Sequence, residues 1–161
     1  MSMYAATTTV PITRSRAEIE DLLQKHKATQ YLTAHDTERG VAIVQFKIQN
    51  RIVRFTVKLP RLDDYAKLRS RKGSTWSPPA SDAQKQAKAD QDGRQRWRAL
   101  LLVIKAKLEC VENGIATFEE EFLAHIVLPN DQTVGEAILP RVAQVYEHGG
   151  LLLPERASVA E

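Results

Sequence analysis

The chain contains few of the residues that build cross-linked, metal-binding or nucleotide-binding proteins. Its single cysteine, Cys110, excludes an intrachain disulfide and a metal site built on cysteines. Its seven glycines form no cluster of the kind that cradles phosphate groups, which argues against a nucleotide-binding fold. We find no nucleophile elbow and no Ser/His/Asp order, and we expect no enzymatic activity and no cofactor.

Long apolar stretches are also missing. No apolar run approaches the roughly 20 residues that a membrane-spanning helix needs. The first ten residues lack the basic and apolar segments of a signal peptide. We therefore expect a cytoplasmic protein with no membrane partner.

The composition is that of an ordinary folded domain, with 43% hydrophobic and 27% charged residues. A chain of 161 residues can bury one stable core without disulfides or metals. We expect a single domain over residues 14–154, a flexible N-terminal tail over 1–13 and a C-terminal tail over 155–161.

Charge is distributed unevenly along the chain. Residues 50–98 carry 13 Lys or Arg against 5 Asp or Glu, whereas residues 99–161 carry 4 against 10. Such segregation favours either a surface that faces a polyanion or two oppositely charged parts that attract each other or neighbouring copies.

A helix and three strands are expected in the first part of the chain. Ser15 and Glu18 have the spacing of a capping box for a helix over residues 16–27. Strands are expected over 29–35, 41–48 and 51–59, and a two-residue turn at Gln49 and Asn50 joins the last two. That turn pairs Phe46 with Val53 and leaves one apolar and one basic sheet face.

Residues 61–93 are predicted to form a long basic loop, since they are rich in Lys, Gln, Asp and Ser. Ser81 can cap a short helical segment within it, up to about residue 91, and Gly93 is expected to interrupt or kink that segment. The main helix is expected over residues 94–113, ending at Gly114. Its buried face is predicted to contain Trp97, Leu101, Ile104, Leu108 and Val111.

Two shorter helices are expected after it. Thr117 with Glu120, and Thr133 with Glu136, have capping-box spacing. Pro140 predicts a kink in the last helix, or a helix start nearer residue 139. The core face of that helix is predicted to be Ile138, Val142, Val145 and Tyr146.

These elements predict an α+β fold, in which a long helix and C-terminal helices cover one face of a small antiparallel sheet. The order α-β-β-β followed by a long helix resembles that of a double-stranded-RNA-binding domain. The resemblance is in element order only, because none of that family's short motifs is present.

The basic stretch contains the candidate site. Cationic side chains there can bind phosphates, and Trp76 can stack on an exposed base. A solvated loop with Trp76 packed on the fold is the alternative interpretation. The candidate nucleic-acid-binding residues are Lys47, Arg54, Lys58, Lys67, Arg69, Arg71, Lys72, Trp76, Arg94, Arg96 and Arg98.

The other clusters of titratable residues have structural explanations. Glu121 and His125 have the i, i+4 spacing of two metal ligands, but only two ligands are evident, and a pair between these two side chains explains them. Glu119 and Glu120 suit the start of a helix, and His26 and His148 suit helix ends. We therefore expect no metal site.

Residues 94–109 and 114–129 resemble a block found in small uncharacterised proteins of phages and prophages, and the likeness extends from about residue 10 to 154. The resemblance implies no catalytic residues. It implies a phage-type genome, action in the host cytoplasm, and either nucleic-acid transactions or interference with host defence.

Together these patterns favour a non-enzymatic accessory protein that binds nucleic acid through the basic loop and the helix start. The alternative is a protein-interaction or oligomeric module that inhibits or sequesters a host defence factor. In that case the acidic part of one copy would meet the basic part of another.

Overall fold

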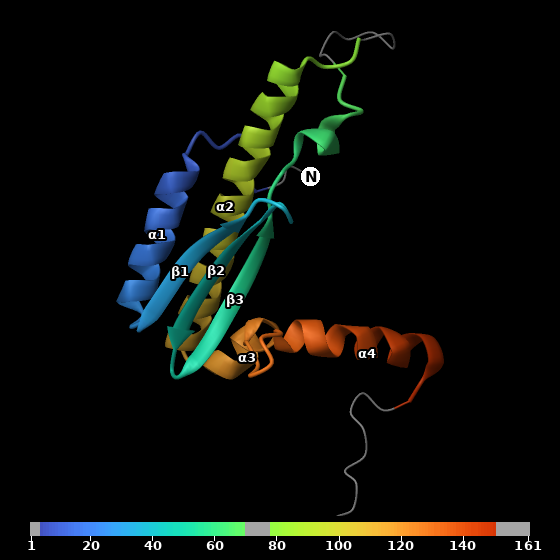
Figure 1. The fold of residues 1–161 in the computed structure, drawn as a ribbon. Helices are drawn as coiled ribbons and strands as arrows, with labels where there is room; N and C mark the ends of the chain where they lie inside the picture. The colour runs from blue at the N-terminus through green and yellow to red at the C-terminus, as the bar shows by residue number, and fades with distance from the viewer. Residues whose placement is uncertain (1–3, 70–77, 151–161) are drawn as a thin grey trace, which may run out of the picture.

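The computed structural model describes residues 4–69 and 78–150, and it has the predicted α+β architecture. The strands β1 (Gln30–Asp36), β2 (Val41–Ile48) and β3 (Arg51–Lys58) form an antiparallel sheet in the order β1-β2-β3. Two helices, α1 (Ile12–Lys25) and α2 (Asp82–Glu112), run in parallel across one face of this sheet (Figure 1).

The predicted hairpin register is confirmed. Phe46 lies opposite Val53, and Ile48 lies opposite Arg51. Gln49 and Asn50 both have positive φ angles, 48° and 62°, as a two-residue type I′ turn requires. The turn places Val53 and Phe46 on the face that α1 and α2 cover.

The core is one cluster between the sheet and the helices. Trp97 and Ile104 of α2 are fully buried against it, as the spacing of apolar residues predicts. The ring of Phe122 meets the ring of Phe46 edge-on, with centroids 5.9 Å apart. Trp97 is therefore a core residue and is not free to stack on a ligand.

Helix α1 begins earlier than predicted, at Ile12, directly after Pro11. The capping role predicted for Ser15 is wrong, because Ser15 lies inside the helix and is fully buried. Its hydroxyl has no hydrogen-bond partner in the described part of the chain. Proline favours a helix start because it fixes φ and lacks an N–H group to satisfy.

Alanine substitutions distinguish the buried serine from a true cap. Ser15→Ala is expected to leave the free energy of unfolding unchanged or raise it by up to about 1 kcal/mol, because it removes an unpaired buried hydroxyl. Ser81→Ala is expected to lower it by about 1 kcal/mol, because Ser81 caps α2. Urea denaturation of both variants measures the difference, and a loss for Ser15→Ala would contradict the assignment.

The helical segment predicted after Ser81 is confirmed, and it is continuous with the main helix predicted from Arg94, so α2 begins at Asp82. Ser81 and Gln84 form a capping box at its start. Gly93 does not interrupt the helix, because it is buried and faces the Ile12 side chain of α1. The predicted loop over residues 61–93 is accordingly shorter, and it contains the short 3-10 helix η1 (Leu62–Tyr65).

Residues 4–10, which belong to the predicted N-terminal tail, contact α2. The Gln91 amide donates hydrogen bonds to the carbonyl oxygens of Ala6 and Thr8, at 2.9 and 3.0 Å. The Gln95 amide donates to the carbonyl oxygen of Tyr4 at 3.0 Å. These contacts direct the chain into the start of α1.

The capping boxes predicted at the starts of the last two helices, at Thr117 and at Thr133, are both confirmed. They begin α3 (Phe118–Phe122), which continues into the 3-10 helix η2 (Leu123–His125), and α4 (Val134–His148). Pro140 lies within α4.

The predicted core face of α4 is wrong. Tyr146 is 89% exposed, and Ile138, Val142 and Val145 are only half-buried, because the helix points away from the sheet (Figure 1). Helix α4 contacts the rest of the fold mainly at η2.

Candidate nucleic-acid interface

The two ends of the molecule differ in their balance of charge, although each contains residues of both signs. Helix η1, residues 66–69 and the first half of α2 lie at one end of the molecule, whereas α3 and α4 lie at the other (Figure 1). We name the first of these the basic end. With Lys58 at the adjoining end of β3, its described residues include eight cations, Lys58, Arg61, Lys67, Arg69, Lys85, Lys88, Arg94 and Arg96, and five carboxylates, Asp63, Asp64, Asp82, Asp90 and Asp92. The opposite, acidic end carries Glu119, Glu120, Glu121, Asp131 and Glu136.

Two of the predicted site residues are exposed lysines at the basic end. Lys58 ends β3, and Lys67 follows η1. Neither forms an ion pair within residues 4–69 and 78–150. Arg69 is exposed and forms an isolated antiparallel bridge with Pro79. That bridge places both ends of the intervening segment at the basic end.

A hydrogen-bonded network joins η1 to α2 at this end. The Tyr65 hydroxyl donates to one oxygen of Asp92 at 2.7 Å, and the Lys88 ammonium lies 2.5 Å from the other. Burial and the bond to Asp92 raise the pKa of Tyr65 to about 12. Burial opposes ionisation of Asp92, but hydrogen bonds from Lys88 and Tyr65 lower its pKa overall. The network orients the Lys88 side chain on the surface of α2.

The arginines of α2 do not form one surface. The Arg98 guanidinium lies 2.7 Å from the Glu18 carboxylate of α1, and the Arg94 guanidinium donates to the Gln91 amide oxygen at 2.6 Å. Arg96 donates to the Lys58 carbonyl oxygen of β3. All three lie in the middle of α2, and not at the start of a helix as the sequence predicts.

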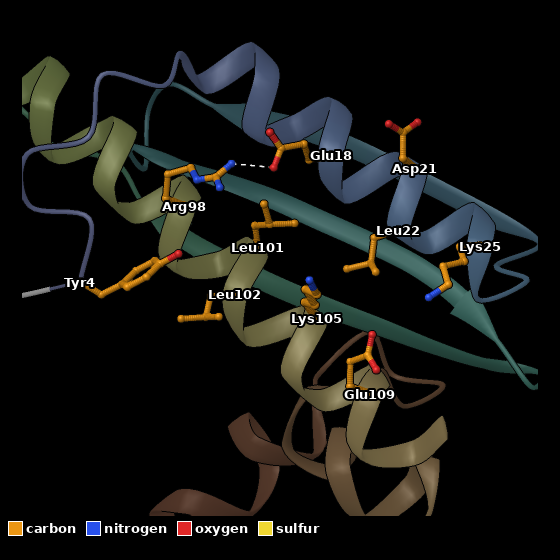
Figure 2. Close-up of a pocket in the computed structure, with 10 residues that line it drawn as sticks. All are labelled: Tyr4, Glu18, Asp21, Leu22, Lys25, Arg98, Leu101, Leu102, Lys105 and Glu109. Carbon is orange, nitrogen blue, oxygen red and sulfur yellow. Dashed lines mark hydrogen bonds and ion pairs between the residues drawn. The ribbon is translucent and has the colours of Figure 1, made fainter. Parts of the chain in front are cut away.

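Arg98 and Glu18 also mark one end of a groove between α1 and α2, which has a volume of about 470 Å³ (Figure 2). The hydrogen bond from Arg98 is the main reason that the pKa of Glu18 is lowered. Leu22, Leu101 and Leu102 provide apolar side chains in the groove. Arg98 therefore holds the two helices together.

Two predicted site residues lie on the sheet face that α1 and α2 leave uncovered. Lys47 is half-buried on β2, and Arg54 lies on β3. The Arg54 guanidinium is only 18% exposed and lies 2.5 Å from the Asp131 carboxylate, and it also donates to the Gln45 amide oxygen at 3.0 Å. Arg54 thus ties the loop after η2 to the sheet. The remaining predicted residues, Arg71, Lys72 and Trp76, lie outside the described residues.

The predicted pair of Glu121 with His125 is not formed. The His125 ring stacks on Phe55 with a centroid distance of 4.1 Å, and burial there lowers the pKa of its imidazole. The Glu121 carboxylate instead lies 3.3 Å from the Lys107 ammonium, and it accepts a hydrogen bond from the Cys110 thiol at 3.4 Å. Burial and this contact raise the pKa of Cys110, which favours its unreactive thiol form.

The predicted site omits Lys85 and Lys88, because the sequence analysis treats the helical segment after Ser81 as part of the loop. The Ser81 and Gln84 capping box is the signal for that helical segment.

Comparison of the chain with protein-family models, with curated proteins and with solved structures finds no match. Among the described residues, no helix has both the length and the apolar character needed to cross a membrane.

Proposed function

We propose that this protein is a non-enzymatic module that binds nucleic acid through its basic end. The observation that carries the proposal is the excess of cationic side chains at the basic end, eight against five carboxylates among the described residues, and the excess of acidic ones at the other end. Such a field attracts a polyanion to one end and repels it from the other, which orients the complex. Lysines that meet phosphates also gain affinity by releasing condensed counterions.

The contacts are assigned to the lysines that the fold leaves accessible. Lys58 and Lys67 form no ion pair with the described residues, so a phosphate can bind them without displacing a carboxylate from that part of the chain. Lys85 is less accessible, with 22% of its side chain exposed, and its ammonium lies 3.1 Å from the carboxylate of Asp82, three residues earlier on the same helix. Pairs of this kind contribute only about 0.2–0.5 kcal/mol, so a phosphate can replace the carboxylate.

The segment between Arg69 and Pro79 extends the proposed interface. It carries Arg71, Lys72 and Trp76, and the bridge between residues 69 and 79 attaches both of its ends to the basic end. We assign phosphate contacts to Arg71 and Lys72, and base stacking to Trp76. Arg94, Arg96 and Arg98 position the helix, and they do not count among the phosphate contacts.

A pair of charge-reversal variants tests the proposal. Lys58→Glu with Lys67→Glu is expected to weaken binding at least about 100-fold, because two phosphate contacts become repulsive. Lys25→Glu with Lys105→Glu makes the same change in net charge at exposed positions outside the basic end. Lys105 is 17 residues along α2 from Lys88, which corresponds to about 25 Å.

The measurement is a mobility-shift titration with single- and double-stranded DNA and RNA at low salt. Wild-type protein and the control variant are expected to bind equally well, within about threefold. Equal weakening of both variants would show that net charge alone drives binding, and it would contradict an interface at the basic end. If the wild-type protein binds none of these nucleic acids at low salt, the proposal is wrong.

A second candidate is self-association, in which the acidic end of one copy meets the basic end of another. The exposed face of α4 favours it, since Leu139 is 65% and Tyr146 is 89% exposed. A dimeric mass in light scattering after nuclease treatment, lost on adding salt, would favour this candidate over nucleic-acid binding. For such a protein-interaction module, the proposed biological role is inhibition or sequestration of a host defence factor. The resemblance to phage proteins would place either activity in the cytoplasm of a bacterial host.

A further inference from the structure

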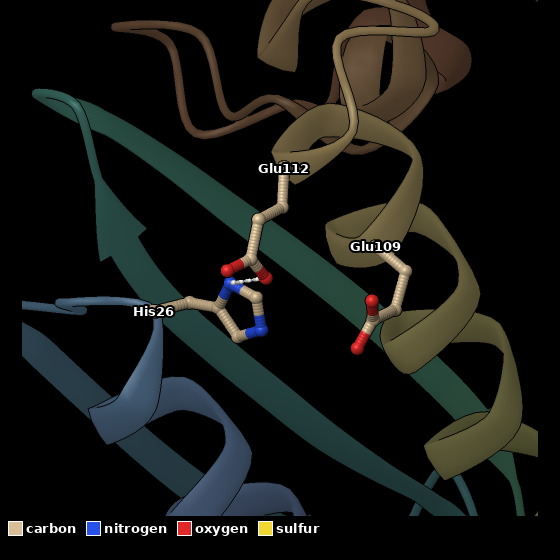
Figure 3. Close-up of side chains that lie close together, drawn as sticks. All are labelled: His26, Glu109 and Glu112. Atoms are coloured by element: carbon tan, nitrogen blue, oxygen red, sulfur yellow. Dashed lines mark ion pairs between the residues drawn. The ribbon is translucent and has the colours of Figure 1, made fainter.

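The end of the α1–α2 groove brings together three side chains that are far apart in the sequence. His26 caps the C-terminus of α1, and Glu109 and Glu112 lie in the last turns of α2. One imidazole nitrogen and one oxygen from each carboxylate all lie within 4.8 Å of one another. In Figure 3 both carboxylates point toward the His26 ring.

The hydrogen bonds of the described residues do not satisfy this cluster. The His26 side chain is only 12% exposed, and its Nε2 atom is buried without a hydrogen-bond partner in the described part of the chain. Its Nδ1 atom lies 3.7 Å from Glu112, which is longer than an ordinary hydrogen bond. A buried imidazole nitrogen without a partner costs free energy unless a ligand occupies it.

The helices around the cluster favour a cation there. Because α1 and α2 run in parallel, both present their partially negative C-terminal ends at this point. The last turn of α2 contains no basic residue to offset its dipole, and it carries two carboxylates instead. Lys25, in the last turn of α1, and Lys27, directly after the helix, flank His26 in sequence, and both are exposed.

We propose that His26, Glu109 and Glu112 bind a divalent metal ion of the zinc class. One imidazole and two carboxylates are ligands that zinc accepts, and three protein ligands leave a fourth position for water. Tetrahedral ligands at about 2.0–2.2 Å from the metal lie about 3.4 Å apart, so separations of up to 4.8 Å must contract by up to about 1.4 Å. The exposed Glu112 side chain and the half-buried Glu109 side chain would have to rotate to accomplish this contraction.

The ion would fasten the C-terminus of α1 to the last turns of α2. Of the three proposed ligands, Glu109 also lines the groove between these helices (Figure 2). The site lies at the far end of α2 from the basic end. It is therefore independent of the proposed nucleic-acid interface.

Calorimetric titration of the full chain with zinc chloride, in a buffer that does not chelate metals, tests the proposal. We expect saturable binding of one zinc ion per chain, and a rise in Tm of about 5–10 °C at a free zinc concentration of about 100 times Kd. His26→Gln, Glu109→Gln and Glu112→Gln are each expected to weaken binding at least about tenfold. Cobalt should bind in place of zinc with the visible absorption of a tetrahedral complex.

Two control variants separate this site from surface binding. Asp21→Asn removes a carboxylate that lines the same groove outside the cluster, and His148→Gln removes an exposed histidine on α4. Both are expected to bind zinc as the wild-type protein does. Glu112 is 54% exposed, so Glu112→Gln is expected to fold normally, as circular dichroism will show. No saturable zinc binding, unchanged binding by Glu112→Gln, or a preference for calcium or magnesium would each overturn the proposal.

Discussion

Replacing Trp97 with alanine is expected to lower the free energy of unfolding by about 3–5 kcal/mol. Trp97 is completely buried, and its ring lies between α2 and the sheet, with the His35 ring stacked at a centroid distance of 6.4 Å. The Arg16 guanidinium lies 5.9 Å from the centroid of the same ring. Removal of the indole leaves a cavity that the surrounding helices and strands can fill only in part.

Two further variants test whether burial of Trp97 causes the loss in the free energy of unfolding. Tyr146→Ala removes a large aromatic side chain that is 89% exposed, and it is expected to change the free energy of unfolding by no more than about 0.5 kcal/mol. Trp97→Phe is expected to cost clearly less than Trp97→Ala, because the buried indole N–H has no partner among the described residues. Urea denaturation measures all three values, and a small loss for Trp97→Ala would contradict the core assignment.

Gly135→Ala is expected to destabilise the protein by about 1–3 kcal/mol, because it overpacks the junction between α4 and η2. A Cβ atom at Gly135 would lie 2.8 Å from the carbonyl oxygen of Ala124 and 3.5 Å from its Cβ atom. The first neighbour is backbone and cannot rotate away. Helix α4 would have to shift, and its contacts with the rest of the fold lie mainly at η2.

The same substitution at Gly93 is not expected to destabilise the protein. There a Cβ atom would lie 3.4 Å from the end of the Ile12 side chain, which can move. Alanine favours the interior of a helix over glycine by about 0.8–1.0 kcal/mol, so Gly93→Ala is expected to be neutral or stabilising. Thermal unfolding of the two variants measures the contrast, and destabilisation by Gly93→Ala equal to that by Gly135→Ala would contradict this packing.

The hairpin and the buried face of α2 could be predicted because their signals are local. The turn at Gln49 and Asn50 determines which residues pair, and the spacing from Trp97 to Leu108 identifies one helical face. The start of α2 was misplaced because Gly93 was interpreted as a break. Its position against Ile12, which explains why glycine suits the helix there, depends on contact with a distant segment.

The candidate site was harder to predict because charge does not reveal which partner each cation finds. Arg98 pairs with Glu18, which is 80 positions away in the sequence, and Arg54 pairs with Asp131, which is 77 positions away. Likewise, the apolar residues of α4 indicate a core-facing helix, although the fold directs Tyr146 into solvent. The group of His26, Glu109 and Glu112 shows no sequence spacing that suggests a metal site, because it forms only when α1 packs in parallel with α2.

The salt dependence of nucleic-acid affinity tests the central claim most directly. If about four or five phosphates contact the basic end, the logarithm of the association constant should fall with the logarithm of the salt concentration at a slope of about −4. Raising the salt from about 50 to 200 mM should then weaken binding by about two orders of magnitude. Replacing Lys58 and Lys67 with alanine should reduce the steepness of that slope by about 2. A flat slope, or the same slope for wild-type protein and this variant, would contradict the account.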